Sequence, residues 1–299
     1  MSNLAFRVKY LRRSREIWRR YLASKPWLDQ LYLIFLDIRP GQKIVDVGCG
    51  PGDFTRYLAK LSKGRSKIIG IDSNPKSIKA AIADTKKARL SHVTSYKIGD
   101  VYKIPIDENY ADLTCCRTLL MHLTDPLKAV QELSRITKPG GSVVAVELGK
   151  MSSFHDPNDE KFTRLVDEVW EAWVRGGRKL EGKDFRIGEK LPGIFQRAGL
   201  TSIKAEAQSD AYITSDPRRE MNDVKAELRF SLLVFREQMK IDRKYVVAGG
   251  LSNAKINAYN KRFISKTETL LSDEQKLRTD PTISTSSLFI VSGMKKDLA

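Results

Sequence analysis

The chain has 299 residues, of which 41% are hydrophobic and 30% are charged, a composition typical of a globular protein with a sizeable core. Its three cysteines provide neither a disulfide framework nor a metal-binding spacing, and no apolar run approaches the roughly 18 residues that a membrane-spanning helix needs. These features exclude a disulfide-rich scaffold and a membrane-embedded protein. They are typical of a reducing compartment, and we expect a cytoplasmic protein.

The net charge of +17 is concentrated near the N-terminus. Residues 1–26 hold eight lysines and arginines against a single acid, Glu16. The basic residues 7–25 would suit a weak contact with RNA or an anionic surface, although a solvated helix face explains such a charge run equally well. An arginine-rich, acid-poor start is also typical of a mitochondrial transit peptide. Against that alternative, the segment carries an apolar stripe suited to docking on a folded body: Val8, Leu11, Trp18, Tyr21 and Leu22.

Helical patterns open the chain, and a strand followed by a tight turn comes next. The first two predicted helices cover 5–24 and 27–36, and we expect residues 1–39 to form an N-terminal helical cap. A short apolar run at 43–47 predicts a buried strand. The glycine-dense turn 48–52 follows it and leads directly into a helical pattern.

The alternation of strands with helices then continues. Four further strands are predicted, and helical patterns separate them: 67–71, 94–98, 111–117 and 142–148. Five strands in this arrangement predict an α/β fold with a doubly wound, mostly parallel sheet. We assign residues 40–150 to this core.

Beyond residue 150 the pattern becomes mainly helical. Helices are predicted at 158–175, 187–199, 217–240 and 254–272, and strands at 201–207 and 285–293. We expect Gly176-Gly177 to end the first of these helices. The two strands would complete a seven-stranded sheet, so residues 151–299 are assigned to the same single domain, with helical inserts after strands 5 and 6. The insert at 209–284 is expected to cover a ligand cavity or to form the surface of a homodimer.

Three acidic residues follow or interrupt consecutive strands of the predicted core. Asp46 lies inside the first strand, where a buried carboxylate is costly unless it accepts hydrogen bonds. Asp72 ends the second strand, a position from which a carboxylate can accept both hydroxyls of a ribose. Asp100 ends the third strand, where a carboxylate could accept the amino group of an adenine. Each alone could be an ordinary loop or capping residue, but together they indicate a nucleoside site.

The glycine spacing distinguishes between classes of ligand. The turn has the pattern Gly48-x-Gly50-x-Gly52 with Pro51 inside it, whereas a dinucleotide site has Gly-x-Gly-x-x-Gly. The Gly-Lys-Ser/Thr of a P-loop is absent, and no cluster of lysines or hydroxyl residues follows to hold phosphates. The pattern therefore favours a nucleoside-like ligand that need not carry phosphate.

These motifs resemble those of the class I S-adenosylmethionine-dependent methyltransferases. Residues 45–52 are similar to the first motif of that family, Ile71-Asp72 to its ribose-binding acid, and Gly99-Asp100-Val101 to its adenine-contacting turn. Residues 121–126 and 138–141 resemble segments of its quinone-biosynthesis-like branch (methyltransferase type 11/25-like), with Met121 in place of a histidine. The resemblance implies a Rossmann-like methyltransferase fold, S-adenosyl-L-methionine as methyl donor, S-adenosyl-L-homocysteine as product, and no metal.

The resemblance also implies roles for individual residues. Those expected to contact the donor are Asp46, Gly48, Cys49, Gly50, Gly52, Phe54, Asp72, Ser73, Asp100, Val101 and Arg117. Arg117 ends the fourth strand, where its charge could hold the carboxylate of the donor, although an ordinary surface arginine explains the position equally well. His122 is a candidate for a catalytic base, although a packing or capping role explains it equally well. His155 and Tyr10 are further candidates, because the first insert and the N-terminal helix are expected to border the acceptor cavity. Many enzymes of this family use no base at all.

The predicted function is in-line methyl transfer to a small-molecule acceptor, with the N-terminal helix and the helical insert as a lid. An RNA methyltransferase is the first alternative, favoured by the basic charge. Against it, Cys115-Cys116-Arg117-Thr118 lacks the Asn-Pro-Pro-Tyr pattern used on adenine amino groups. A non-catalytic module that binds S-adenosylmethionine or RNA is the second alternative, which a damaged donor site would indicate. The sequence does not identify the acceptor or distinguish O-, N-, C- and S-methylation.

Overall fold

The computed structural model describes residues 27–149 and 153–297, and these divide into two compact units. The strand unit comprises the described residues of the segments 30–151, 183–208 and 287–299. The helical unit comprises those of the segments 1–29, 152–182 and 209–286. Each unit is therefore built from stretches that are distant in the sequence. The predicted helix at 5–24 lies outside the described residues, and the predicted domain boundaries stay a prediction.

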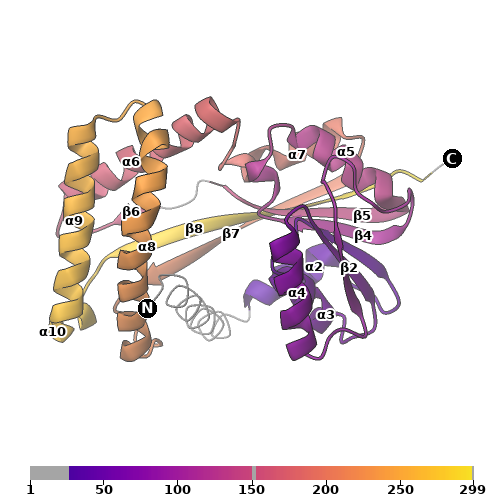
Figure 1. Ribbon diagram of the computed structural model, residues 1–299, viewed down its shortest axis with the longest axis horizontal. Helices are drawn as coiled ribbons and strands as arrows, with labels where there is room; N and C mark the ends of the chain where they lie inside the picture. The colour runs from indigo at the N-terminus through magenta and orange to yellow at the C-terminus, as the bar shows by residue number, and fades with distance from the viewer. Residues whose placement is uncertain (1–26, 150–152, 298–299) are drawn as a thin grey trace. The chain divides into compact units, whose positions relative to one another are not determined.

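Eight strands form one sheet among the described residues (Figure 1). They are β1 (Lys43–Val47), β2 (Lys67–Asp72), β3 (Thr94–Ile98), β4 (Ala111–Arg117), β5 (Thr137–Leu148), β6 (Ser153–His155), β7 (Thr201–Ile213) and β8 (Ile283–Met294). Their order is β3-β2-β1-β4-β5-β8-β6, and β7 also pairs with β8. Strands β1 to β5 pair with one another in parallel, whereas β8 is antiparallel to both β5 and β6.

The helices that the structure describes alternate with the parallel strands and then dominate the later part of the chain. They are α2 (Trp27–Leu36), α3 (Asp53–Leu61), α4 (Pro75–Lys87), α5 (Pro126–Ile136), α6 (Glu160–Glu181), α7 (Leu191–Arg197), α8 (Met221–Ala248), α9 (Asn253–Ser272) and α10 (Glu274–Arg278), with single 3-10 turns η1 (Leu120–His122) and η2 (Ile187–Lys190). The predicted doubly wound, mostly parallel α/β fold is confirmed. The three-residue strand β6 is the addition to the seven strands predicted.

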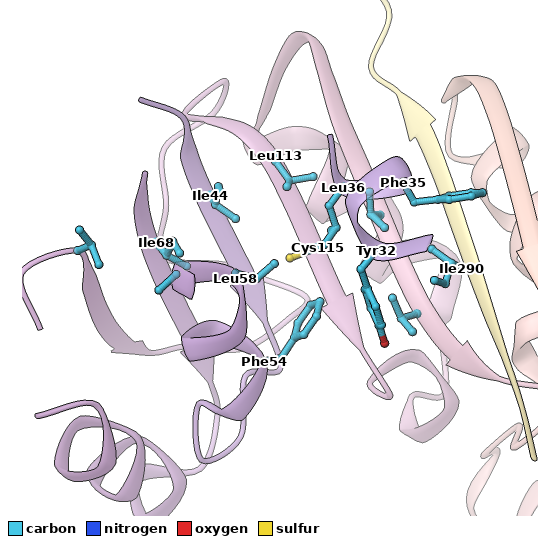
Figure 2. Packing of buried hydrophobic residues seen from close by; sticks show 14 residues of the cluster. Tyr32, Phe35, Leu36, Ile44, Phe54, Leu58, Ile68, Leu113, Cys115 and Ile290 are labelled. Carbon is cyan, nitrogen blue, oxygen red and sulfur yellow. The ribbon is translucent and has the colours of Figure 1, made fainter. Parts of the chain in front are cut away.

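A continuous apolar core joins α2 and α3 to the strands of the strand unit (Figure 2). Its members come from both helices and from five strands, and the largest are Tyr32, Phe35, Leu36, Ile44, Phe54, Leu58, Ile68, Leu113 and Ile290. Because successive side chains of a strand point to opposite faces, Cys115 lies in this core while Cys116 points to the other face. Both thiols are fully buried, as predicted for core residues.

The helical unit has its own core between α6, α8 and α9. Val169, Ala172, Val246 and Ile256 form its buried centre. The two long helices α6 and α8 approach each other closely at two glycines: a Cβ on Gly176 would lie 1.8 Å from a backbone oxygen of α8. At the end of α8, a Cβ on Gly249 would meet a backbone oxygen of α6 at the same distance.

This close approach explains why one sequence prediction was wrong. Gly176-Gly177 was expected to end its helix, but α6 continues through both glycines to Glu181. The local rule for glycine did not hold because Gly176 provides space for the neighbouring helix, and α6 ends instead at Gly182 in a left-handed conformation (φ 66°). Among the described residues, no helix is long and apolar enough to cross a membrane.

Candidate functional site

The carboxyl ends of β1, β2 and β4 meet at one edge of the sheet. In the register of the parallel pairs, Val47 lies opposite Ile71 on β2 and opposite Cys116 on β4. The strand order also changes direction between β1 and β4, because β2 and β3 continue to one side and β5 to the other. In open α/β sheets this switch point is where ligands bind.

The glycine turn after β1 depends on backbone conformations that disfavour side chains. Gly48, Gly50 and Gly52 all have positive φ angles, of 73°, 52° and 78°. The amides of Gly48 and Cys49 both donate to the carbonyl of Ile71, at 2.7 and 2.9 Å. A Cβ on Gly48 would also lie 2.7 Å from Leu119 Cδ1. The turn is therefore held to β2. Of its three glycines, Gly48 packs against Leu119 and Gly52 against Tyr96, whereas a Cβ on Gly50 would meet nothing within 4 Å.

Asp72 joins the ends of the first two strands. Its Oδ2 accepts the amide of Gly50 at 2.9 Å, and its Oδ1 accepts the amide of Asn74 at 2.8 Å. Each carboxylate oxygen has a second lone pair, so these bonds leave acceptor capacity for two hydroxyl groups. The carboxylate is half-buried, and the neighbouring Ser73 is exposed. This arrangement fits the ribose of a nucleoside ligand.

Asp46 is a buried carboxyl group directly below the turn. It is 1% exposed, and Thr55 Oγ1 donates to its Oδ2 at 2.6 Å. Burial raises the pKa of Asp46 to about 7, although the Thr55 hydrogen bond and the charge of Arg117 both act to lower it. The group therefore titrates near neutrality in the ligand-free protein, and an added positive charge would favour its ionised form.

This shift predicts how stability depends on pH. Between the ordinary aspartate pKa of 3.8 and the folded value of about 7, the folded protein holds the Asp46 proton while the unfolded chain releases it. The stability from this group is thus fully present below pH 3.8 and is lost as the pH rises through 7, at up to about 1.4 kcal/mol per pH unit. We expect Asp46→Asn to reduce the slope of unfolding free energy against pH, measured by denaturant titration of ligand-free protein between about pH 5 and 7.

The slope should be reduced rather than abolished, because burial also raises the pKa of a second buried carboxyl, Glu147, to about 7. Asp53→Asn is the matched control, since Asp53 begins α3 close to Thr55 in the sequence, yet its side chain is 46% exposed beside Arg56. An Asp46→Asn slope equal to that of the parent protein would contradict the shifted pKa.

Arg117 and Phe54 lie together at the end of β4. The guanidinium carbon of Arg117 is 5.8 Å from the centre of the Phe54 ring, within the range of a cation–π contact. Arg117 is exposed, whereas Phe54 is 6% exposed and packs against Tyr32 and Tyr57 at ring distances of 5.9 and 6.1 Å. The ring therefore supports a cation that can still reach a ligand carboxylate.

Asp100 and Val101 begin a short turn after β3. Oδ1 of Asp100 accepts the amide of Tyr102 at 2.9 Å, and its carbonyl accepts the amide of Lys103 at 3.1 Å. The carboxylate is exposed, and Val101 is half-buried. Asp100 follows β3, whose last residue Ile98 pairs with Asp72, so both acids lie at the same edge of the sheet.

The three candidate bases lie in different surroundings or outside the described residues. His122 ends η1 and makes an edge-to-face contact with Phe185, with ring centres 5.9 Å apart. Partial burial lowers the pKa of His122, and the charge of Lys183 lowers it further, so the neutral imidazole is favoured. His155 is exposed on β6, with its Nδ1 4.0 Å from a carboxylate oxygen of Glu160. Tyr10 lies outside the described residues.

Cys49 has no features of a reactive thiol. It is buried in the turn, and burial followed by the charges of Asp46 and Asp72 raises the pKa of the thiol well above its usual range. A neutral thiol is a poor nucleophile. Cys49 therefore acts here as a small turn residue. Within the part of the chain that the structure describes, no group of three His, Cys, Asp or Glu side chains could hold a metal ion.

Two supporting side chains were not singled out from the sequence. Arg56 is 7% exposed and donates to the carbonyl of Pro51 at 2.8 Å and to Asp53 at 2.6 Å, so it braces the glycine turn from α3. Glu147 is fully buried at the end of β5 and accepts the amides of Leu119 and Leu120. A charge within an otherwise apolar strand was the available signal for Glu147, the same signal that identified Asp46.

Comparison with known proteins gives a consistent result. A family profile described as "Methyltransferase domain" matches residues 45–145. An uncharacterized transposon protein of Streptomyces fradiae is 36% identical over 180 residues, which are 58% of this chain and 50% of that protein. The demethylmenaquinone methyltransferase of Bacillus subtilis (strain 168) is 26% identical over 191 residues, 62% of this chain and 81% of that enzyme.

An uncharacterized methyltransferase of Schizosaccharomyces pombe is 30% identical over 154 residues, 50% of this chain and 55% of that protein. The chain thus spans about half the length of the Streptomyces and Schizosaccharomyces relatives. Among solved structures, the YcgJ protein of Bacillus subtilis superposes with a TM-score of 0.53 at 15% identity, covering 90% of this chain and 98% of that one. Identity this low supports the fold alone.

The match of residues 45–145 covers the glycine turn, the Asp72 site and strands β2 to β4. These are the parts of the molecule that form the proposed nucleoside site. Over residues 45–145 the chain is therefore similar to a methyltransferase domain, and this match supports the predicted resemblance to the class I S-adenosylmethionine-dependent methyltransferases.

Proposed function

We propose that the protein transfers a methyl group from S-adenosylmethionine to a small-molecule acceptor by in-line displacement. The observation that supports the proposal is the glycine turn itself, with three positive φ angles and a bond from Gly50 to Asp72, a backbone arrangement that would suit the close approach of a nucleoside ligand. The name of the Bacillus subtilis relative, a demethylmenaquinone methyltransferase, supports a small-molecule acceptor.

The donor-binding roles follow from chemistry that the residues can perform. Asp72 would accept the ribose hydroxyls with the lone pairs that its backbone contacts leave available. Gly48 and its neighbours would lie along the methionine part of the donor, where Arg117 could hold the carboxylate. Asp46 would offset the donor's positive charge from below the turn. Asp100 and Val101 would contact the adenine.

When bound, the donor supplies a methyl group already activated by the sulfonium, so the protein's task is to position two reactants and exclude water. His122 is the described residue best suited to accept a proton from an acceptor hydroxyl or amine. Its lowered pKa favours the neutral imidazole, which is the form that a general base requires. The proposal does not depend on it, because a sulfonium donor can react with an already ionised acceptor.

Calorimetry on the full chain tests the donor assignment. We expect S-adenosylhomocysteine and S-adenosylmethionine to bind with micromolar affinity, whereas NAD should not bind, because the turn lacks the dinucleotide spacing. The absence of binding heat at millimolar S-adenosylhomocysteine would overturn the proposal. Ser77→Ala on α4, outside the glycine turn, is the control variant and should bind the donor as the parent protein does.

A transfer assay with methyl-labelled donor addresses the acceptor. We expect label to appear in the small-molecule fraction of a cell extract and not in its RNA. Label in RNA alone would reject a small-molecule acceptor while leaving the donor assignment intact.

A further inference from the structure

The end of β5 carries a buried carboxylate with an unusual set of partners. Glu147 has no exposed surface, and its Oε1 accepts the amide of Leu119 at 2.8 Å and that of Leu120 at 2.7 Å. Its other oxygen, Oε2, is buried and has no hydrogen-bond partner among the described residues. Burying such a group costs free energy, and one oxygen recovers part of it through two backbone bonds.

The two amides belong to the turn that follows β4. This turn begins with Thr118 in a left-handed conformation (φ 50°), which a β-branched residue seldom adopts. The amide of Thr118 donates to Val146 at 2.8 Å, and the carbonyl of Met121 accepts the amide of Asp184 at 3.1 Å. The strained turn is thus held at several points, and Glu147 provides two of the bonds.

The side chain of Leu119 connects this turn to the donor site. Both of its terminal methyl carbons would lie within 3 Å of a Cβ on Gly48, so Leu119 packs directly against the glycine turn. Gly48 in turn donates to Ile71 next to Asp72. A shift of the Leu119 backbone would therefore move its side chain toward or away from the glycine turn at Gly48, which would face the donor.

We propose that Glu147 is a positioning residue for donor binding. Its carboxylate fixes the backbone of Leu119, and the Leu119 side chain then holds the glycine turn at Gly48 in position. The proposal rests on the proposed function, because it concerns the same donor site. Glu147 does not touch the donor. Its effect passes from β5 through the amide of Leu119 to the backbone of the glycine turn.

A role confined to stability would predict a different outcome, and Asp112 provides the comparison. Asp112 is also a carboxylate on the parallel sheet that accepts a backbone amide from outside its own strand, that of Lys43 at 2.7 Å. It lies at the start of β4, at the opposite end from the donor site, and pairs with Lys138. Loss of its charge should disturb the fold without reaching the glycine turn.

The experiment measures S-adenosylhomocysteine affinity by calorimetry on the full chain, well below each variant's melting temperature. Because burial raises the pKa of Glu147 to about 7, the measurement is made at about pH 8.5, where the group is a carboxylate. There we expect Glu147→Gln to weaken binding about tenfold, since a neutral acceptor forms weaker bonds than a carboxylate. Asp112→Asn should change affinity less than about twofold. Leu119→Ala keeps both amides but removes the contact with Gly48, and we expect it to weaken binding about fivefold.

The double variant Glu147→Gln/Leu119→Ala separates a shared path from two independent effects. If Glu147 acts through Leu119, the double variant should bind about tenfold more weakly than the parent protein, not about fiftyfold. A double variant that binds about fiftyfold more weakly, or a Glu147→Gln affinity equal to that of Asp112→Asn, would overturn this proposal and leave the proposed function intact. Failure of the parent protein to bind S-adenosylhomocysteine would overturn it together with the proposed function. If Glu147→Gln does not fold, Leu119→Ala and Glu147→Asp replace it in the test. Glu147→Asp keeps the negative charge on a side chain one methylene shorter. It must weaken binding more than Asp112→Asn does, or the proposal fails.

Discussion

Replacing Asp72 with alanine is expected to weaken S-adenosylhomocysteine binding by about 1.5–3 kcal/mol, which corresponds to roughly tenfold or more in affinity. Two losses combine in this variant. The carboxylate that would bind the ribose hydroxyls disappears, and the amides of Gly50 and Asn74 lose the acceptor that holds the turn to the end of β2. Calorimetry on the full chain measures the effect.

Two further variants separate these losses. Asp72→Asn keeps one acceptor oxygen, so we expect an intermediate affinity. Asp84→Ala is the matched control, because Asp84 is a carboxylate of α4 that pairs only with Lys87 across one helical turn among the described residues. An Asp72→Ala affinity indistinguishable from that of Asp84→Ala would rule out a ribose contact at this position.

Gly176→Ala is expected to destabilise the helical unit by about 3 kcal/mol. The added methyl group would lie 1.8 Å from the carbonyl oxygen of Tyr245 and 2.5 Å from its carbon. Because these are backbone atoms of α8, no side-chain rotation relieves the clash, and α6 and α8 must move apart. Denaturant unfolding followed by tryptophan fluorescence reports on this, since Trp170 and Trp173 stack on α6 with ring centres 5.0 Å apart.

Gly193→Ala provides the control for this prediction. Gly193 lies within α7, and a Cβ there would meet nothing within 4 Å. Alanine favours a helix over glycine by up to about 1 kcal/mol, so this variant should be as stable as the parent protein or slightly more stable. Equal stability of the two alanine variants would show that the α6–α8 approach does not require glycine.

Much of the donor site could be predicted from the sequence because its signals are local. The glycine spacing and the acids that follow β2 and β3 depend only on neighbouring residues, so strand periodicity was enough to bring Asp72 and Asp100 to one edge. Gly176 was misinterpreted because its reason lies in another helix, 69 residues further on at Tyr245. Glu147 carried a local signal, a charge within an apolar strand, but its partners could not be predicted because it accepts amides 27 and 28 residues away. Tertiary contacts of this kind leave little trace in a single sequence.

The place of β8 in the sheet has a consequence for the order of assembly during synthesis. Strand β5 is complete at Leu148, but its antiparallel neighbour is not made until residues 283–294 emerge. Throughout that interval the edge of β5 that will pair with β8, including the apolar residues Val143 to Val146, has unpaired backbone groups. Such an edge is a template for pairing with other chains. A ribosome stalled within the helical segments would therefore present an aggregation-prone intermediate, and a chaperone that shields β5 would be needed longest during that stretch of translation.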